Sequence, residues 1–249
     1  MPGISDNHYH TALVTGASSG IGAETVRSLS AAGLDVHAVA RRGSRLEALA
    51  AETGCTAHVL DVRDTDAVYE LLTPLSCDVL VNNAGLGRGF ETLQSATRED
   101  IDRTLSTNVT AAFHVTRAVL PGMVERKRGH VVNIGSTAGL YPVGPSIYGA
   151  SKGAIHLMCR NMRIELAGTG IRVTEICPGR VVTEFFDVAL DDEHEAKSKL
   201  DVGAALLEPG DIAEAVVYAV RAPQRVNVNM IEIQPTAQHY GGAQITPQA

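Results

Sequence analysis

Residues 15–22 read TGASSGIG and join a short apolar run, residues 12–15, to a segment of helical composition, residues 20–32. The run predicts a buried strand. A glycine-rich turn after a strand lets the backbone approach a pyrophosphate, and the following helix offers free N–H groups and the positive end of its dipole. The spacing is TGxxxGxG rather than the commoner GxGxxG, but the strand-turn-helix context still indicates a phosphate-binding turn. The candidate contacts in this turn are Gly16, Ser18, Ser19, Gly20, Ile21 and Gly22.

Outward from this turn, the chain alternates apolar strand-like runs with helix-length segments. The predicted strands are residues 36–40, 57–60, 79–81, 130–134, 171–177 and 230–233, and the predicted helices are residues 44–52, 64–72, 97–125, 146–167 and 209–220. Strands separated by helices favour βαβ units, and parallel strands buried on both faces have continuous apolar runs of this kind. We therefore predict an α/β fold: a single domain over residues 1–249, with a Rossmann-like doubly wound parallel sheet flanked by helices. Residues 184–208, the least periodic stretch, are expected to form a mobile flap over a site.

Composition and charge exclude several other classes of protein. The formal net charge of −7 argues against nucleic acid as a partner. No apolar run approaches the ~18 residues of a membrane helix, and residues 1–10 lack the apolar region of a signal peptide. The four cysteines form no CxxC pair and, like the histidines, lack metal-ligand spacing. We therefore expect no membrane contact, no metal site, buried thiols in a reducing compartment, and a cytoplasmic location.

The residues after the second predicted strand indicate which dinucleotide binds. An acidic residue at this place would accept the 2′-hydroxyl of NAD. The chain instead has Ala40 followed by Arg41 and Arg42. Guanidinium groups bind a 2′-phosphate well, through bidentate hydrogen bonds. We therefore expect NADP(H) as the cofactor, with both arginines at its 2′-phosphate.

Tyr148 and Lys152 are four residues apart in a predicted helix, so they lie on one face within contact range. A phenol with its ordinary pKa of about 10 exchanges protons poorly near neutrality. A neighbouring ammonium group stabilises the phenolate and lowers that pKa. The pair therefore predicts a general acid and base for an alcohol–ketone reaction.

Seven short motifs follow one another along the chain. They are TGASSGIG (15–22), LDV (60–62), NNAG (82–85), TNV (107–109), NIGSTAG (133–139), YGASK (148–152) and PGRVVT (178–183). In these motifs and their order, the chain resembles the compact, single-domain short-chain dehydrogenases over nearly its whole length. The resemblance implies an oxidoreductase in which the cofactor supplies the hydride and the protein supplies orientation and a proton path.

The resemblance also implies roles at the matched positions. Tyr148 would donate or accept the proton, and Lys152 would lower the pKa of Tyr148 and hold the nicotinamide ribose. Ser136 would hydrogen-bond the substrate oxygen, and Asn108 would anchor a water that links Lys152 to solvent. The further cofactor contacts that it implies are Asp61, Val62, Asn83, Ala84, Gly85, Pro178, Gly179, Val181 and Thr183.

Within this family, residues 117–142 and 231–242 are most similar to NADP-dependent 3-hydroxy acid dehydrogenases of the serine and allo-threonine type. This similarity implies hydride transfer between NADP(H) and a small hydroxyl or carbonyl substrate, such as a 3-hydroxy acid or a related anionic alcohol. Arg88 and Arg180 are candidates for binding a carboxylate or sulfonate of that substrate. The resemblance further implies a homotetramer that is built on the helices predicted at 97–125 and 146–167.

Two other functions stay open at this level. A ketone or ketoester reductase with a neutral substrate and a wider apolar pocket would carry the same motifs. A catalytically silent NADP-binding regulator would share the fold, because function depends on the site. The presence of Tyr148, Lys152, Ser136 and Asn108 speaks against the regulator, which we expect to have lost at least one of them.

Overall fold

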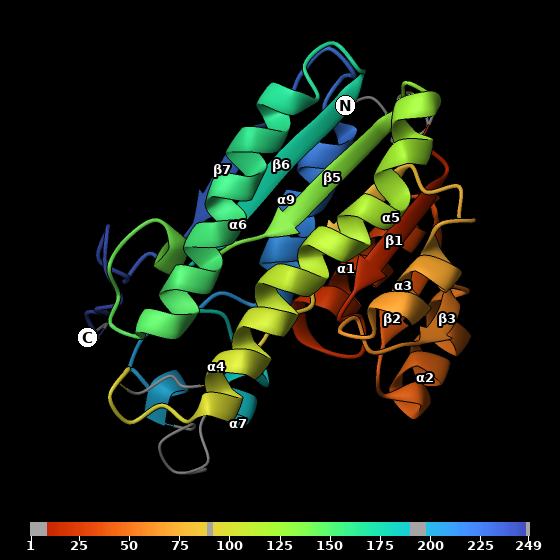
Figure 1. Ribbon diagram of the computed structural model, residues 1–249. Coiled ribbons are helices and arrows are strands. Elements are labelled where there is room, and N and C mark those ends of the chain that lie inside the picture. Colours follow the sequence, from red (N-terminus) through yellow and green to blue (C-terminus); the bar gives the residue numbers. More distant parts are fainter. Residues whose placement is uncertain (1–8, 89–91, 190–197, 248–249) are drawn as a thin grey trace.

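The computed structural model describes residues 9–88, 92–189 and 198–247, which form one parallel sheet with helices on both faces (Figure 1). The strand order is β3-β2-β1-β4-β5-β6-β7, and all neighbouring strands run parallel. The strands are β1 Thr11–Thr15, β2 Asp35–Ala40, β3 Thr56–Val59, β4 Val79–Asn82, β5 Gly129–Ile134, β6 Ile171–Pro178 and β7 Met230–Ile233. The predicted doubly wound α/β sheet is confirmed.

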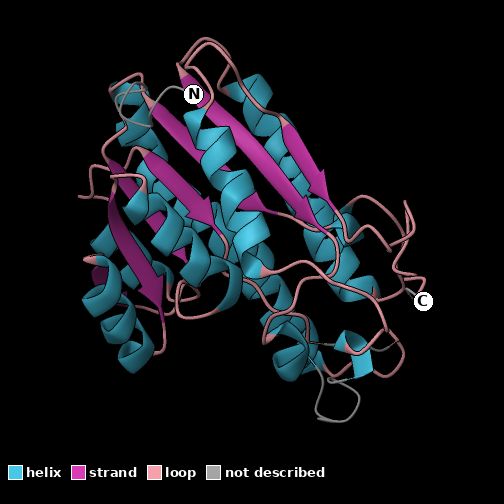
Figure 2. Cartoon of the chain, turned by 180° about the vertical axis from the view of Figure 1, so that it is seen from behind, coloured by secondary structure: helices cyan, strands magenta, loops and turns pink. Residues whose placement is uncertain are grey.

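Two layers of helices cover the sheet, as the opposite views of Figures 1 and 2 show. The helices are α1 Gly20–Ala31, α2 Gly43–Thr53, α3 Thr65–Leu72, α4 Arg98–Leu105, α5 Ala111–Glu125, α6 Ser146–Glu165, α7 Phe185–Ala189 and α9 Pro209–Arg221. Apolar side chains of α1, α2 and α9 pack on one face of the sheet, and those of α3, α5 and α6 pack on the other. Burial on both faces explains why the strands read as continuous apolar runs.

Strand β1 shows how the two cores arise from one stretch of sequence. Successive side chains of a strand point to opposite faces. Ala12 and Val14 accordingly join the core under α1 and α9, whereas Leu13 joins the core under α3, α5 and α6. All three are fully buried, so neither face of this strand tolerates a polar residue.

The direction of winding places the site. From β1 the chain moves through β2 to β3 on one side, then crosses to β4 on the other side of β1. The switch between β1 and β4 leaves a crevice at the carboxyl ends of these strands, where open α/β sheets bind ligands. Gly16 follows β1 and Asn83 follows β4, so both predicted cofactor motifs meet at this crevice.

The long helical stretch expected at 97–125 is helical throughout but not uniform. Helix α4 begins with a capping box of Thr97 and Asp100. A five-residue π-helix, Ser106–Thr110, then separates α4 from α5. π-Helical turns shift the hydrogen-bond pattern and are frequent at functional sites. This one contains Asn108, and the 3.6-residue sequence pattern gave no sign of it.

The segment expected to be a flap, residues 184–208, lies partly outside the described residues, at 190–197. Its described parts include α7, in which Phe186 and Ala189 are buried, with Phe185 and Leu200 packed against them. The structure thus adds a short helix that the sequence analysis did not expect. The mobility of the segment stays a prediction.

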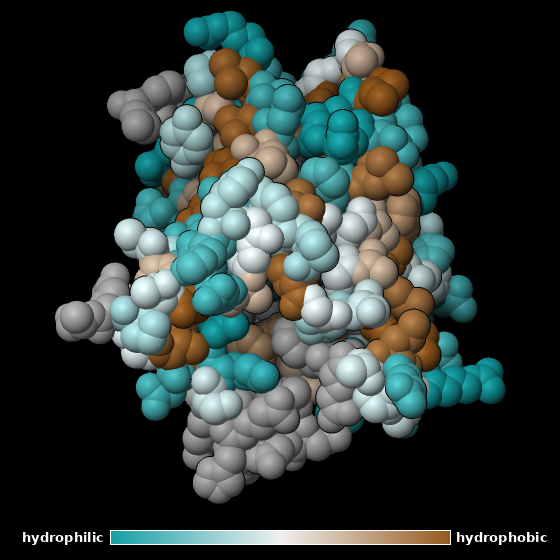
Figure 3. Space-filling model, turned by 90° about the vertical axis from the view of Figure 1, so that its left-hand side faces the viewer, coloured by the Kyte–Doolittle hydropathy of each residue, from teal (hydrophilic) through white to brown (hydrophobic). Residues whose placement is uncertain are grey.

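Among the described residues, we find no helix with both the length and the hydrophobicity that crossing a membrane requires. Seen from the side of β7 and the C-terminus, the surface shows apolar side chains in separate groups among polar ones (Figure 3).

Candidate active site

The glycine-rich turn brings three segments of backbone into close contact. Gly16 has a positive φ of +68°, and a Cβ there would lie 2.8 Å from the Cα of Ala84. A Cβ on Gly22 would lie only 2.3 Å from the carbonyl oxygen of Gly16. Ser19, the N-cap of α1, makes no side-chain hydrogen bond to that helix, so the first N–H groups of α1 stay available to an anion.

A cleft of about 900 Å³ runs along the carboxyl ends of the strands. It is lined by nearly all residues predicted to bind the dinucleotide: Gly16, Ser18, Ser19, Gly20, Ile21, Arg41, Arg42, Asp61, Val62, Asn83, Ala84, Gly85, Tyr148, Lys152, Pro178, Gly179, Val181 and Thr183. Gly22 is not part of the lining, because it packs α1 against the end of β1. Gly22 thus has a packing role in this turn, and its contact with the cofactor stays a prediction.

Arg41 and Arg42 stand at one end of this cleft in different environments. Arg42 donates hydrogen bonds to Ser18 Oγ (3.0 Å), Ser19 Oγ (2.6 Å) and Glu184 Oε2 (2.8 Å). Arg45 donates to both oxygens of the same carboxylate, at 2.7 and 2.9 Å. Within the described chain, Arg41 is exposed and forms no hydrogen bond or ion pair. Arg41 is therefore the guanidinium most available to a ligand.

Glu184 and Arg45 were not among the sequence candidates. The two arginines hold the pKa of the Glu184 carboxyl below its usual range. Glu184 directly follows the PGRVVT motif, and Arg45 comes four residues after Arg41 in the chain. These positions hint at a role, but only the fold shows that residues 139 apart in sequence meet.

Asp61 is similarly engaged at the neighbouring strand end. Its carboxylate accepts hydrogen bonds from Arg63, the shortest at 2.6 Å, and these lower the pKa of Asp61. Asp61 and Arg63 both line the cleft. Their pairing neutralises the charge of Asp61 at a position where the resemblance implies contact with the cofactor.

The three residues predicted to perform proton chemistry meet on the other side of the cleft. The side chains of Tyr148 and Ser136 are hydrogen-bonded to each other. Lys152 Nζ lies 5.9 Å from the centre of the Tyr148 ring and donates to the carbonyl oxygen of Ile134 at 2.7 Å. The Phe185 ring packs on Tyr148, with ring centres 5.2 Å apart. Helix α6 thus places Tyr148 and Lys152 on one face, and the end of β5 supplies Ser136.

The pKa of Tyr148 differs from the sequence expectation. Burial raises it to about 12, the hydrogen bond with Ser136 opposes that rise, and Lys152 does not lower it. Burial also lowers the pKa of Lys152 to about 8. The expected lowering of the Tyr148 pKa by Lys152 is therefore not seen, because the ammonium group is directed to a backbone carbonyl. At neutral pH the phenol holds its proton and Lys152 is charged.

Asn108 is buried in the π-helix, and its side chain joins two segments. Its Oδ1 accepts from the backbone N–H of Leu86 (2.8 Å), and its Nδ2 donates to the Leu86 carbonyl (2.8 Å) and to Ser151 Oγ (3.0 Å). Both N–H groups of the amide are thus engaged, whereas Oδ1 accepts one hydrogen bond of the two it can accept. A water at Asn108, as the resemblance implies, would donate to Oδ1 or to the main-chain carbonyl.

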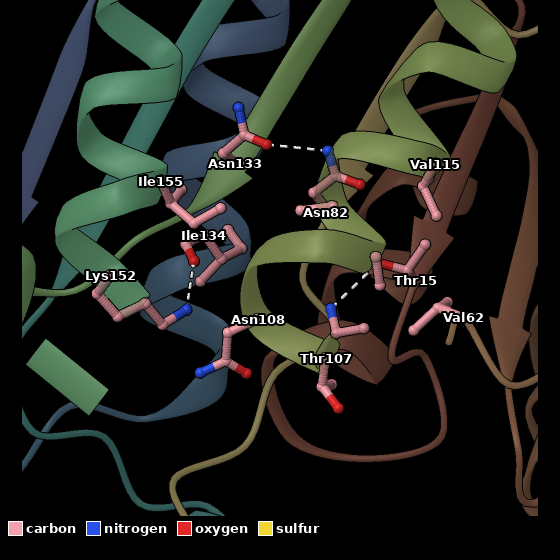
Figure 4. Close-up of a pocket in the computed structure, with 13 residues that line it drawn as sticks. Thr15, Val62, Asn82, Thr107, Asn108, Val115, Asn133, Ile134, Lys152 and Ile155 are labelled. Atoms are coloured by element: carbon pink, nitrogen blue, oxygen red, sulfur yellow. Dashed lines mark hydrogen bonds between the residues drawn. The ribbon is translucent and has the colours of Figure 1, made fainter. Parts of the chain in front are cut away.

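A small cavity with both polar and apolar walls lies between Asn108, Lys152 and the strands, as Figure 4 shows. Its volume of about 10 Å³ is roughly the room that one water needs. The lining includes Asn82 and Asn133, which are hydrogen-bonded to each other at 2.9 Å. The hydroxyl oxygen of Thr107, also in the lining, is buried without a hydrogen-bond partner. The size and polarity of this cavity suit a single water beside Lys152.

The two arginines predicted to bind substrate separate in the fold. Arg88 is not among the residues that line the cleft, and it pairs with Asp100 at 3.1 Å. A carboxylate at the start of α4 thus pairs with Arg88, and the contact of Arg88 with the substrate stays a prediction. Arg180 does line the cleft, together with Ser136 and Tyr148.

Comparison with known proteins now adds to this geometry. A family model described as short chain dehydrogenase matches residues 10–194. The chain belongs to the short-chain dehydrogenase family. An NADP-dependent 3-hydroxy acid dehydrogenase of Salmonella typhi is 43% identical over 243 residues, covering 94% of this chain and 98% of the relative. The relative of the same name from Escherichia coli K12 is 41% identical over 245 residues, covering 95% and 99%.

Solved structures agree with this short-chain dehydrogenase in fold. The closed form of serine dehydrogenase complexed with NADP⁺ has a TM-score of 0.89 and 40% identity, covering 96% of this chain and 100% of that one. Serine dehydrogenase from Escherichia coli has a TM-score of 0.80 and 38% identity, covering 92% and 100%. The predicted short-chain dehydrogenase family, an oxidoreductase enzyme and the similarity to NADP-dependent 3-hydroxy acid dehydrogenases are confirmed.

Proposed function

We propose that this short-chain dehydrogenase transfers hydride between NADP(H) and a small hydroxyl or carbonyl substrate that carries an acid group, such as a 3-hydroxy acid. The proposal depends above all on one observation: Tyr148 is hydrogen-bonded to Ser136 and lies over Lys152, inside the cleft that the glycine-rich turn opens. The names of the relatives, NADP-dependent 3-hydroxy acid dehydrogenase and serine dehydrogenase, support the same substrate class.

The residues of the cleft fit NADP(H). The uncapped start of α1 suits the pyrophosphate, and the exposed Arg41 suits a 2′-phosphate. The predicted cofactor agrees with the NADP named for the relatives. When bound, this cofactor supplies or accepts the hydride.

The side chains of the protein handle the proton. We assign Ser136 to hold the substrate oxygen and Tyr148 to exchange a proton with it. At neutral pH Tyr148 is protonated, because burial raises its pKa to about 12, so it is ready to act as the acid in carbonyl reduction. For alcohol oxidation the phenolate must be stabilised, and Lys152 is the cation nearest to its ring.

Replacing Tyr148 by Phe tests this proposal. We expect kcat to fall by about 10²- to 10⁴-fold, because general acid–base catalysis is lost. The dissociation constant of NADPH should stay within about two-fold of the wild-type value, since the aromatic ring that packs on Phe185 is kept. Tyr218→Phe, at an exposed position of α9, is the matched control. Unchanged NADPH-linked turnover in Tyr148→Phe would refute the enzyme mechanism and favour the silent regulator.

A substrate panel separates the acid-specific enzyme from the ketone reductase. We expect reduction of NADP⁺ with 3-hydroxy acids and weaker reduction with neutral secondary alcohols. Activity with neutral alcohols alone would refute the acid substrate class and leave the ketone or ketoester reductase.

The homotetramer and the cytoplasmic location belong to this proposal. Phe113 on α5, and Leu157 and Ile164 on α6, are exposed apolar side chains on the helices expected to form the interface. The four cysteines are buried free thiols, in keeping with a reducing compartment. Light scattering tests the oligomer: a monomer mass would exclude it.

A further inference from the structure

Arg180 follows strand β6, and Ser136 follows β5, the strand next to β6 in the sheet, so both lie at the same edge of the sheet. Arg180 comes after Pro178 and Gly179 at the carboxyl end of β6, and its backbone N–H donates to Gln238 Oε1 at 3.0 Å. Ser136, Tyr148, Arg180 and Gln238 all line the same cleft. The position of the Arg180 backbone is thus fixed by a side chain from the C-terminal segment.

The guanidinium of Arg180 contacts only neutral groups in the described chain. Its two terminal nitrogens donate to the carbonyl oxygens of Lys199 (3.1 Å) and Ala243 (3.3 Å). The side chain is half-buried, and burial lowers its pKa. A buried charge without an opposite charge is unfavourable unless something else compensates it.

Other arginines at or near the cleft differ from Arg180 in this respect. Arg42 pairs with Glu184 at 2.8 Å, Arg63 with Asp61 at 2.6 Å, and Arg88 with Asp100 at 3.1 Å. Arg41 has no such partner but is exposed, so water compensates its charge. Of these five, Arg180 alone combines burial with the lack of a carboxylate.

The distribution of charge in the cleft points the same way. Its described acidic lining residues are Asp61 and Glu184, and arginines at the nucleotide end engage both. Two further cations that line the cleft, Lys152 and Arg180, donate to backbone carbonyls and form no ion pair with a described carboxylate. In a chain of net charge −7, these two positive charges mark a place for an anion.

We propose that Arg180 is the specificity-determining residue that binds the acid group of the substrate. This inference rests on the proposed function and adds to it the residue that distinguishes acidic from neutral substrates. A carboxylate meets a guanidinium through two parallel hydrogen bonds, which are stronger than those to neutral carbonyls. The substrate is then held at two points: its acid group by Arg180, and its hydroxyl or carbonyl oxygen by Ser136 and Tyr148.

The two carbonyl groups that accept hydrogen bonds from Arg180 belong to different segments of the chain. Lys199 follows the α7 region, whereas Ala243 lies in the C-terminal segment. Arg180 therefore joins β6 to both of these segments, and Lys199 and Ala243 also line the cleft. A substrate carboxylate on Arg180 lies against these segments and would compete with their carbonyls for its N–H groups.

Arg180→Met tests the proposal by comparing 3-hydroxybutyrate with its methyl ester. We expect kcat/KM for the acid to fall by at least about 100-fold, because a charge-assisted pair is lost, while kcat/KM for the ester changes by less than about three-fold. Arg180→Lys should recover only part of the activity with the acid, since an ammonium cannot bind a carboxylate in bidentate fashion. Arg98→Met, on a fully exposed side chain of α4, is the control for loss of one charge.

A binding measurement separates specificity from a general defect. We expect the inhibition constant of propanoate, which has an acid group but no hydroxyl, to rise at least about ten-fold in Arg180→Met, while the dissociation constant of NADPH stays unchanged. Equal losses for acid and ester, or unchanged propanoate inhibition, would overturn the role of Arg180 and leave the proposed function intact. Loss of activity with both the acid and the ester in Tyr148→Phe, by contrast, tests the proton transfer of the proposed function.

The wild-type enzyme is also compared on 3-hydroxybutyrate, its methyl ester and 2-hydroxyethanesulfonate. A higher kcat/KM with one of the two anions than with the ester supports the proposal and shows whether Arg180 prefers a carboxylate or a sulfonate. A higher kcat/KM with the ester than with both anions would overturn the proposal.

Discussion

Arg41 and Arg42 are neighbours in sequence, but the fold gives them different surroundings. Arg42 is held by Ser18, Ser19 and Glu184, and so braces the glycine-rich turn. Arg41 is exposed at the lip of the cleft and, in the described residues, has no partner. We therefore expect Arg41 to supply most of the discrimination between NADP and NAD.

Arg41→Ala tests this expectation. Loss of charge-assisted hydrogen bonds to a phosphate should raise the dissociation constant of NADP⁺ by about 10- to 100-fold. The dissociation constant of NAD⁺, which lacks the 2′-phosphate, should change by less than about two-fold. Calorimetric titration with both dinucleotides measures this, and Arg98→Ala controls for the change in net charge. An equal loss for the two dinucleotides would contradict a role at the 2′-phosphate.

At the scale of elements, an ion pair connects two edges of the cleft. Arg42 and Arg45 belong to the turn after β2 and the start of α2, whereas Glu184 belongs to the segment between β6 and α7. These elements are not neighbours in the sheet. Arg42 and Glu184 both line the cleft, so this contact connects two segments of its wall.

Glu184→Gln should therefore accelerate the release of NADPH. All three side chains are more than 40% exposed, at 43% for Arg42, 46% for Arg45 and 43% for Glu184, so we expect a modest effect of about two- to five-fold. Stopped-flow fluorescence of NADPH measures the rate. Glu52→Gln, which removes the exposed pair with Arg27 on α1, is the matched control. A slower release would mean that the carboxylate repels the cofactor rather than connecting the two segments of the wall.

The π-helix between α4 and α5 is the second feature at this scale. It turns Asn108 inward, where its amide joins the loop after β4 to Ser151 of α6. The TNV motif identified Asn108 as a site residue, but the apolar pattern of 97–125 was that of an ordinary helix. A π-turn differs from an α-turn by one residue in its hydrogen bonding, and the packing against α6 decides between them.

At the scale of the whole molecule, one buried histidine connects stability to pH. His130 on β5 is fully buried, and its Nε2 lies 2.7 Å from Thr174 Oγ1 on β6. Burial, and then the charge of Arg172, lowers its pKa well below the usual value. Below about pH 6.5 the unfolded chain therefore takes up a proton that the folded chain does not.

The free energy of unfolding should consequently fall as the pH drops below about 6.5, by at most about 1.4 kcal/mol per pH unit from this group. His130→Gln should make this slope smaller, whatever its effect on stability at neutral pH. His37 and His58, whose pKa values burial also lowers, keep their contribution in both proteins. Urea unfolding at several pH values measures the slopes, with His239→Gln at an exposed position as the control. Identical slopes in wild type and His130→Gln would show that His130 is protonated equally in both states.

The sequence by itself determined the alternation of strands and helices, and therefore which residues end up at the carboxyl edge of the sheet. These features depend on short-range patterns: apolar runs, glycine turns and the spacing of Tyr148 and Lys152 along one helix. The tertiary structure alone decided which charges meet. Arg42 and Glu184 form an ion pair although they are 142 residues apart in sequence. Arg88 forms an ion pair with Asp100, whereas Arg180 donates hydrogen bonds to neutral carbonyl oxygens. Ion pairing and desolvation depend on distances across the fold and on burial, and neither is encoded in local sequence spacing.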